Sequence, residues 1–209
     1  MQTIHVVIAE NHHALYAPAI CKMIAESAAQ RGTGIAKRSP EEIAAKIEAG
    51  KAVIALCGEE LVGFCYIQEW QEGEFSSNSA LIVHPHYRSR GIAKAIKEKA
   101  FELARQKFPN AKLFGLTTSL PVMKINSELG YKPVTFNLIP SDDQFWEGCK
   151  GCVNHDILIR MNRKHCLCNA LLFDPEKEEQ KKLEEEIKNH LEFFKQTTEQ
   201  KKTEPLLVS

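Results

Sequence analysis

A short basic segment between a predicted strand and a predicted helix carries the residues best suited to chemistry. It reads Arg88-Ser-Arg-Gly91-Ile-Ala93-Lys94 and follows an apolar run. Gly91 and Ala93 have little or no side chain, so a ligand can closely approach the backbone N–H groups at the helix start. Those unpaired N–H groups and the positive end of the helix dipole attract anions. Because Arg88, Arg90 and Lys94 add positive charge, the segment predicts a diphosphate-binding site.

Hydropathy patterns predict the elements that must position this segment. Strands are expected over residues 4–9, 52–57, 61–69, 74–83, 112–117 and 132–138, and helices over residues 14–30, 39–50, 91–107 and 121–129. Ser39 and Pro40, followed by two glutamates, form a strong helix start. The predicted order is therefore β-α-α-β-β-β-α-β-α-β, in which the basic segment joins the fourth strand to the third helix.

Composition excludes several classes of protein. The chain has 209 residues, of which 44% are apolar and 26% charged, as in soluble globular proteins. Lys+Arg and Asp+Glu both number 27, and a neutral chain argues against general nucleic-acid binding, which needs a basic surface. The sequence has no apolar run long enough to span a bilayer and no recognisable signal peptide. We therefore expect a cytoplasmic protein without nucleic-acid or membrane partners.

The segment from Leu81 to Ala93 resembles the central motif of the GNAT family of acyl-CoA N-acyltransferases. That motif is an apolar strand, often followed by His-Pro, and then Arg/Gln-x-x-Gly-x-Gly/Ala at a helix start; Arg88, Gly91 and Ala93 stand at its defining positions. The resemblance implies an α/β GNAT fold, with a mixed, mostly antiparallel sheet flanked by helices. It also implies acetyl-CoA, or a related acyl-CoA, as co-substrate.

The resemblance assigns roles by position. It implies that the N–H group of Leu81 polarises the thioester carbonyl and that the neighbouring strand backbone pairs with the pantetheine arm. The backbone N–H groups and the basic side chains of the loop would hold the pyrophosphate. The residues so assigned to coenzyme A are Ile82, Val83, Arg88, Ser89, Arg90, Gly91, Ile92, Ala93 and Lys94.

The chain departs from the family at two catalytic positions. Many members carry a glutamate base where this chain has Ser77, and a tyrosine acid where it has Asn126. Asn126 cannot protonate a thiolate, although it could bind coenzyme A or substrate. A base is still needed to remove the ammonium proton of the acceptor. The candidates are Glu69, Glu72, Glu74 and His84, or a water molecule that relays the proton.

A narrower resemblance concerns the acceptor. N-acetylglutamate synthases of the GNAT type carry short motifs similar to Arg38-Ser39, Leu116-Thr117-Thr118, Leu129-Gly130-Tyr131 and Leu138-Ile-Pro140. This resemblance implies an amino-acid acceptor, glutamate first, whose carboxylate Arg38 grips while the hydroxyls of Thr117 and Thr118 add hydrogen bonds. Two alternatives remain open: acetylation of a protein lysine or polyamine, and a catalytically silent acyl-CoA sensor.

Four cysteines lie close together in the sequence after this core. Cys149 and Cys152 form a Cys-x-x-Cys pair, and Cys166 and Cys168 follow on a predicted final strand. Four soft ligands at this spacing suit a tetrahedral structural zinc. Reduced thiols without a metal and redox chemistry are the alternatives.

We divide the chain into an acyltransferase core over residues 1–140, a cysteine-containing extension over 141–174 that completes the sheet, and a charged helix and tail over 175–209. The last segment has a narrow apolar stripe formed by Leu183, Ile187, Leu191 and Phe194. A solvated helix and a helix that binds a partner or forms a homodimer are both consistent with this stripe.

Overall fold

The computed structural model describes residues 3–31 and 36–203; it does not describe the side chains at 31, 191 and 193–203. The chain divides into two compact units, Met1–Phe173 and Asp174–Ser209. A seven-stranded sheet forms the centre of the first unit, and one long helix forms the second. Within the described ranges, no helix is both long and apolar enough to cross a membrane.

The sheet confirms the expected mixed, mostly antiparallel architecture. Its strands lie in the order β1-β2-β3-β4-β5-β7-β6, and only β4 and β5 run parallel. The bounds are β1 (Ile4–Ile8), β2 (Ala52–Cys57), β3 (Glu60–Trp70), β4 (Phe75–Val83), β5 (Lys112–Thr117), β6 (Lys132–Val134) and β7 (Asn169–Phe173).

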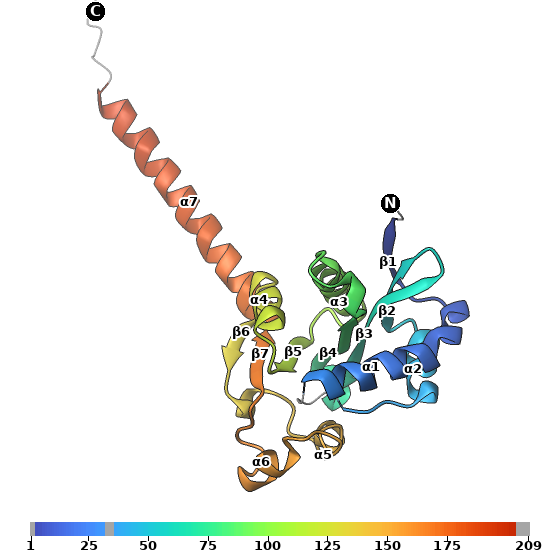
Figure 1. The fold of residues 1–209 in the computed structure, drawn as a ribbon. Helices are drawn as coiled ribbons and strands as arrows, with labels where there is room; N and C mark the ends of the chain where they lie inside the picture. Colours follow the sequence, from blue (N-terminus) through green and yellow to red (C-terminus); the bar gives the residue numbers. More distant parts are fainter. Residues whose placement is uncertain (1–2, 32–35, 204–209) are drawn as a thin grey trace, which may run out of the picture. The chain divides into compact units, whose positions relative to one another are not determined.

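Helices cover both faces of this sheet (Figure 1). They are α1 (Ala17–Arg31), α2 (Pro40–Glu48), α3 (Ile92–Lys107), α4 (Leu120–Glu128), α5 (Asp143–Glu147) and α6 (His155–Arg160). Residues of α1 and α2 share one apolar cluster with Phe64 of β3, while α3 shares another with Leu113 of β5. Ser39 caps α2 as predicted, since its hydroxyl accepts a hydrogen bond from the N–H of Glu42.

The segment after α4 differs from the sequence prediction in three ways. The strand expected over residues 132–138 ends at Val134, because Phe136 turns inward and stacks on Trp146 with ring centroids 5.9 Å apart. Helix α6, which we did not predict, follows the first cysteine pair. The last strand begins at Asn169, so Cys166 and Cys168 precede it rather than lie on it.

The parallel pair β4 and β5 separates part-way along its length. The two strands pair only from Phe75↔Lys112 to Ser77↔Phe114, although β4 continues to Val83 and β5 to Thr117. Ala80 adopts a left-handed backbone conformation with φ 56°, at an irregularity in the pairing of β4 with β3. The edge of β4 that faces β5 therefore has no strand partner beyond Ser77.

The second unit confirms the expected C-terminal helix. This helix, α7, runs from Pro175 to Thr203, and the Asp174 carboxylate accepts a hydrogen bond of 3.2 Å from the N–H of Glu176 at its start. Leu183 and Ile187 of the predicted apolar stripe are exposed within this unit. The other two stripe positions, Leu191 and Phe194, lie among the side chains that the structure does not describe.

Candidate functional site

The basic loop, residues 88–94, joins β4 to α3 with its backbone open to solvent. Gly91 stands at the helix N-cap with φ +78°, and Ser89 also has a positive φ of 63°. A Cβ added at Gly91 would meet no atom within 4 Å, and the first turn of α3 contains no acidic residue. The loop thus has the open helix start that the predicted anion site requires.

The three basic side chains of this loop make different contacts. Arg88 holds the loop to the core, because its Nε donates a hydrogen bond of 3.2 Å to the carbonyl of Val83. Arg90 lies over the ring of Tyr87, with 5.3 Å to the centroid. Lys94 forms an ion pair of 2.9 Å with Glu128 at the end of α4, and this hydrogen bond raises the pKa of the lysine. Arg90 and the backbone are therefore the parts most available to a ligand.

The main cavity of the first unit has a volume of about 770 Å³ and is bordered by the separated ends of β4 and β5. Leu81 of β4, Thr117 and Thr118 at the end of β5, and Asn126 of α4 line it, as does Arg38 from the segment before α2. The structure thus brings together the residues proposed for the carbonyl, the acceptor and the altered acid position. The coenzyme positions of the basic loop do not line this cavity.

Arg38 has a fixed orientation in the cavity wall. Its Nε donates a hydrogen bond of 2.8 Å to the hydroxyl of Tyr66, and its guanidinium lies 5.9 Å from the centre of the same ring. Its Nη1 donates to the carbonyl of Lys37 at 2.9 Å. Arg38 pairs with no carboxylate among the described residues, so its remaining donors are available for a ligand.

The lining of the main cavity is positive. The cationic side chains of Lys37, Arg38 and Lys46 line it, against the carboxylates of Glu42 and Glu147. Both carboxylates are occupied: that of Glu42 accepts a hydrogen bond from the N–H of Ser39, and that of Glu147 pairs with Lys150 at 2.5 Å. The cavity therefore favours a ligand with negative charge.

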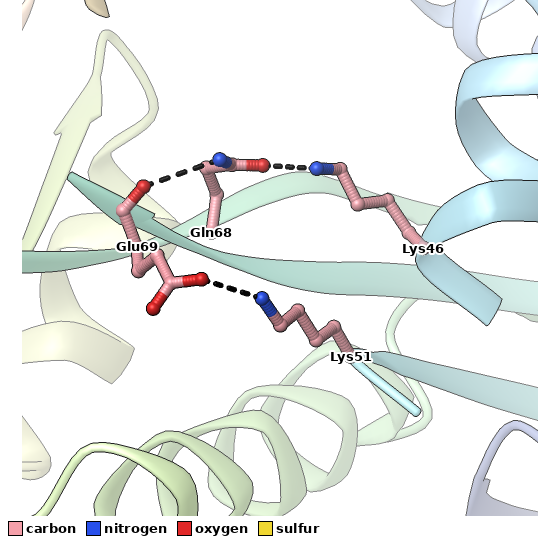
Figure 2. Close-up of polar contacts among 4 residues, drawn as sticks. All are labelled: Lys46, Lys51, Gln68 and Glu69. Carbon is pink, nitrogen blue, oxygen red and sulfur yellow. Dashed lines mark hydrogen bonds and ion pairs between the residues drawn. The ribbon is translucent and has the colours of Figure 1, made fainter. Parts of the chain in front are cut away.

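None of the residues proposed as bases, which are Glu69, Glu72, Glu74 and His84, lines this cavity. Glu69 turns toward Lys51, with 2.8 Å between the carboxylate and Nζ, while Lys46 donates a hydrogen bond to the side chain of Gln68 (Figure 2). Glu74 faces Lys112 at 3.7 Å. Neither glutamate borders the cavity.

The two altered positions of the family motif are both buried. The Ser77 hydroxyl accepts a hydrogen bond of 2.8 Å from the indole N–H of Trp70. Asn126 is 1% exposed, and its Oδ1 has no hydrogen-bond partner. Asn78 of β4, which also borders the cavity, has an unpartnered Nδ2. A ligand with amide groups, such as the pantetheine arm, would satisfy these atoms and the free edge of β4.

The main cavity is also lined by four free cysteine thiols, those of Cys149, Cys152, Cys166 and Cys168. Burial, followed by the neighbouring thiols, raises the pKa of Cys149 to about 11 and that of Cys168 to about 12. In the part of the chain that the structure describes, no group of three or more histidine, cysteine or acidic residues is placed to hold a metal ion. The structure therefore gives the zinc expectation no support, because zinc requires thiolates in a closed arrangement.

Sequence reasoning missed three cavity residues: Lys46, Tyr66 and Lys97. The first two line the cavity only because α2 packs beside β3. Lys97 had a visible signal, since it shares the apolar face of α3 with Ala93, Ala100 and Ala104 at helical spacing. A lysine in such a stripe indicates either a snorkelling side chain or a functional group.

Comparisons with known structures agree on the fold. N-acetylglutamate synthase from Neisseria gonorrhoeae, solved with coenzyme A and N-acetyl-glutamate, matches with a TM-score of 0.59 and 17% identity over 83% of this chain. This chain spans only 35% of that synthase. Diaminobutyrate acetyltransferase EctA from Paenibacillus lautus, solved with L-2,4-diaminobutyric acid and coenzyme A, matches with a TM-score of 0.56 and 12% identity, over 84% of this chain and 96% of EctA.

A third structure, yncA from Salmonella typhimurium with its cofactor acetyl-CoA, matches with a TM-score of 0.57 and 10% identity, over 83% of this chain and 94% of yncA. No curated protein matches the sequence. Residues 19–123, which include β2 to β5, the basic loop and α3, match the profile of the acetyltransferase (GNAT) family. Because this match covers half of the chain and agrees with the fold and the loop geometry, the chain belongs to the acetyltransferase (GNAT) family of enzymes.

Proposed function

We propose that the protein transfers an acetyl group from acetyl-CoA to the α-amine of an amino acid, with L-glutamate as the first candidate. The observation that carries this proposal is the charge of the main cavity, which the cationic side chains of Lys37, Arg38 and Lys46 line while its two carboxylates already have partners. A free amino acid brings a carboxylate that such a lining attracts. A polyamine or a lysine side chain brings only positive charge, which the same lining repels.

The donor would be held by the basic loop and the free edge of β4. The N–H groups around Gly91 would bind the pyrophosphate, together with Arg90. The edge of β4 beyond Ser77 has no strand partner, so it can pair with the pantetheine arm as an added strand would. Leu81 then stands at the cavity end of that edge, where its N–H group would donate to the thioester carbonyl.

The acceptor would be held by Arg38. Because Tyr66 fixes the guanidinium in advance, little side-chain entropy is lost when it binds a carboxylate. Thr117 and Thr118, at the end of β5, also line the cavity and would add hydrogen bonds. Lys46 would attract a second carboxylate, and this is the reason for placing glutamate first.

Two of the similar structures support an amino-acid acceptor. The Neisseria gonorrhoeae enzyme was solved with N-acetyl-glutamate and the Paenibacillus lautus enzyme with L-2,4-diaminobutyric acid. At 17% and 12% identity, these likenesses establish a shared fold. The preference for a carboxylate therefore rests on the charged lining of this chain's own cavity.

The test is an endpoint assay by mass spectrometry. Purified protein is given acetyl-CoA and an equimolar panel of the amino acids, two polyamines and a lysine-containing peptide, and succinyl-CoA is supplied in a parallel reaction. We expect N-acetylation of an amino acid, with N-acetylglutamate the largest product. A product on the peptide or a polyamine would overturn the acceptor and keep the family. Binding of acetyl-CoA without any product would favour an acyl-CoA sensor.

A further inference from the structure

Lys97 is a buried amine on the wall of the main cavity. It lies in the middle of α3, it is 2% exposed, and its Nζ lies 5.5 Å from the centre of the Tyr131 ring. Lysine is almost never fully buried unless it is paired. Within the described ranges, however, no hydrogen bond to Lys97 and no carboxylate beside it is found.

The groups that face Lys97 carry no compensating charge. They are the thiol of Cys65 from β3 and the aromatic ring of Tyr131, which follows α4. Burial raises the pKa of Cys65 to about 11, and it raises the pKa of Tyr131 well above its ordinary value. Both groups therefore stay neutral near pH 7. Burial also lowers the pKa of Lys97, because the charged ammonium loses its hydration, and the Cys65 thiol opposes this only in part.

The surroundings place this amine where the reaction would occur. Lys97, Asn78 and Asn126 all border the main cavity at the separation of β4 and β5, and the Tyr131 hydroxyl donates to Asn78 Oδ1 at 3.4 Å. The unpartnered atoms Asn78 Nδ2 and Asn126 Oδ1 belong to the same group. Leu81, the proposed donor to the thioester carbonyl, borders the same space.

Four other charged groups of the lining, at Arg38, Glu42, Lys46 and Glu147, are less suited to move a proton. The amine of Lys46 is hydrogen-bonded to Gln68, and the carboxylates of Glu42 and Glu147 already have partners. Arg38 holds its proton at all physiological pH values. Among these groups, Lys97 alone is almost fully buried and has no hydrogen-bond or ion-pair partner among the described residues.

We propose that Lys97 is the catalytic group that carries the proton during acyl transfer, an inference that rests on the proposed function. Neutral Lys97 Nζ accepts a proton from the acceptor's ammonium group. The freed amine forms a C–N bond with the acyl carbon while the C–S bond breaks, and the Lys97 ammonium gives its proton to the departing sulfur. The new amide nitrogen loses its second proton to water, so the products are the amide, free CoA thiol and one proton. This role replaces the glutamate and tyrosine that are absent at Ser77 and Asn126.

The kinetic test compares Lys97→Met with Lys99→Met. Lys99 lies on the same helix, is exposed and pairs with Glu102, so its variant controls for loss of a lysine from α3. We expect kcat of Lys97→Met to fall about 100-fold or more, with the KM for both substrates changed less than about threefold. The acidic limb of the wild-type kcat profile should also disappear. A kcat within about threefold of wild type, or an unchanged acidic limb, would overturn the proposal.

The stability test separates this role from a structural one. Because the pKa of Lys97 is lowered in the folded state, that state binds fewer protons than the unfolded chain, and wild-type stability gains with rising pH. Lys97→Met should therefore raise Tm, most at about pH 6 and progressively less toward pH 10. A lower Tm at every pH would show that the amine stabilises the fold, and this result would contradict the proposal.

The role of Lys97 can still be tested if the proposed acceptor is wrong. If wild type acetylates a different amine, the kinetic comparison is repeated with that amine, so the failure of the acceptor proposal does not affect it. If no amine reacts, NMR of protein with ¹³C-labelled lysine, bound to acetyl-CoA, follows the Lys97 signal identified by its loss in Lys97→Met. A Lys97 amine that titrates well below ordinary lysines supports the proposal. An amine still fully protonated at about pH 10 overturns it.

Discussion

The basic loop and the main cavity represent two different ways of building a binding site. The loop is one continuous stretch, residues 88–94, and its geometry follows from a strand end, a glycine with positive φ and a helix start. The cavity is assembled from segments far apart in the sequence, among them Arg38 before α2, Leu81 of β4, Lys97 of α3 and the cysteines near β7. The loop uses backbone N–H groups that any sequence supplies, whereas the cavity uses particular side chains. In our proposal, donor binding therefore depends on a local segment, and acceptor choice depends on tertiary packing.

The largest expected effect is a loss of acetyl-CoA affinity when the basic loop is altered and the main cavity is left unchanged. Gly91→Val forces a branched side chain onto φ +78° and fills the space that an anion would approach, so we expect acetyl-CoA affinity to fall about 100-fold. Gly58→Val is the matched control, because Gly58 has φ +61° and equally open surroundings in the β2–β3 turn. Isothermal titration calorimetry measures both. Equal losses in the two variants would show that strain alone is responsible.

The cysteines of the cavity wall provide a second contrast. Since the pKa of Cys149 is about 11 and that of Cys168 about 12, their thiolate fractions at pH 8 are very small. We expect iodoacetamide to alkylate them about 100-fold more slowly than a free thiol, at the same rate with and without a chelator. Peptide mass spectrometry over time gives each rate. Faster alkylation after chelation would show that the thiols hold a metal.

A smaller effect is expected at Asn126, which lines the main cavity from α4. Asn126→Leu removes a buried amide whose Oδ1 has no partner, so the free energy of unfolding should not fall by more than about 1 kcal/mol. The KM for acetyl-CoA should rise about 10-fold, because the pantetheine amides lose a polar neighbour. Chemical denaturation and steady-state kinetics measure the two quantities. A large loss of stability with unchanged KM would assign Asn126 to the fold alone.

The smallest effect concerns a residue that lies outside both regions. Glu69→Gln removes the partly buried ion pair with Lys51, and we expect a stability loss of about 1 kcal/mol. Because Glu69 does not border the cavity, kcat should change less than about twofold across the pH range. A pH profile of kcat checks this. A loss of about 100-fold would restore Glu69 as the general base.

The sequence predicted the loop and most of the sheet because their signals are local. Gly91 and Ala93 by themselves predict a tight strand-to-helix turn. The Ser39 cap of α2 and the β2–β3 hairpin are likewise predicted by residues that are neighbours in the sequence. Helix α6 and the inward turn at Phe136 depend on contacts with Trp146 and Phe114, which no short window contains. The same applies to the site, since Tyr66 and Lys46 meet Arg38 only after α2 has packed on β3.

The proposal that Arg38 binds the acceptor carboxylate is tested by comparing kcat/KM for L-glutamate and for its α-amide, in wild type and in Arg38→Ala. The account predicts that wild type prefers the free α-carboxylate by roughly 30-fold in kcat/KM, as expected for a charged hydrogen bond of about 2 kcal/mol. It further predicts that Arg38→Ala loses this preference while Arg160→Ala, an exposed arginine paired with Asp156, retains it. Equal preference in wild type and Arg38→Ala would contradict the account.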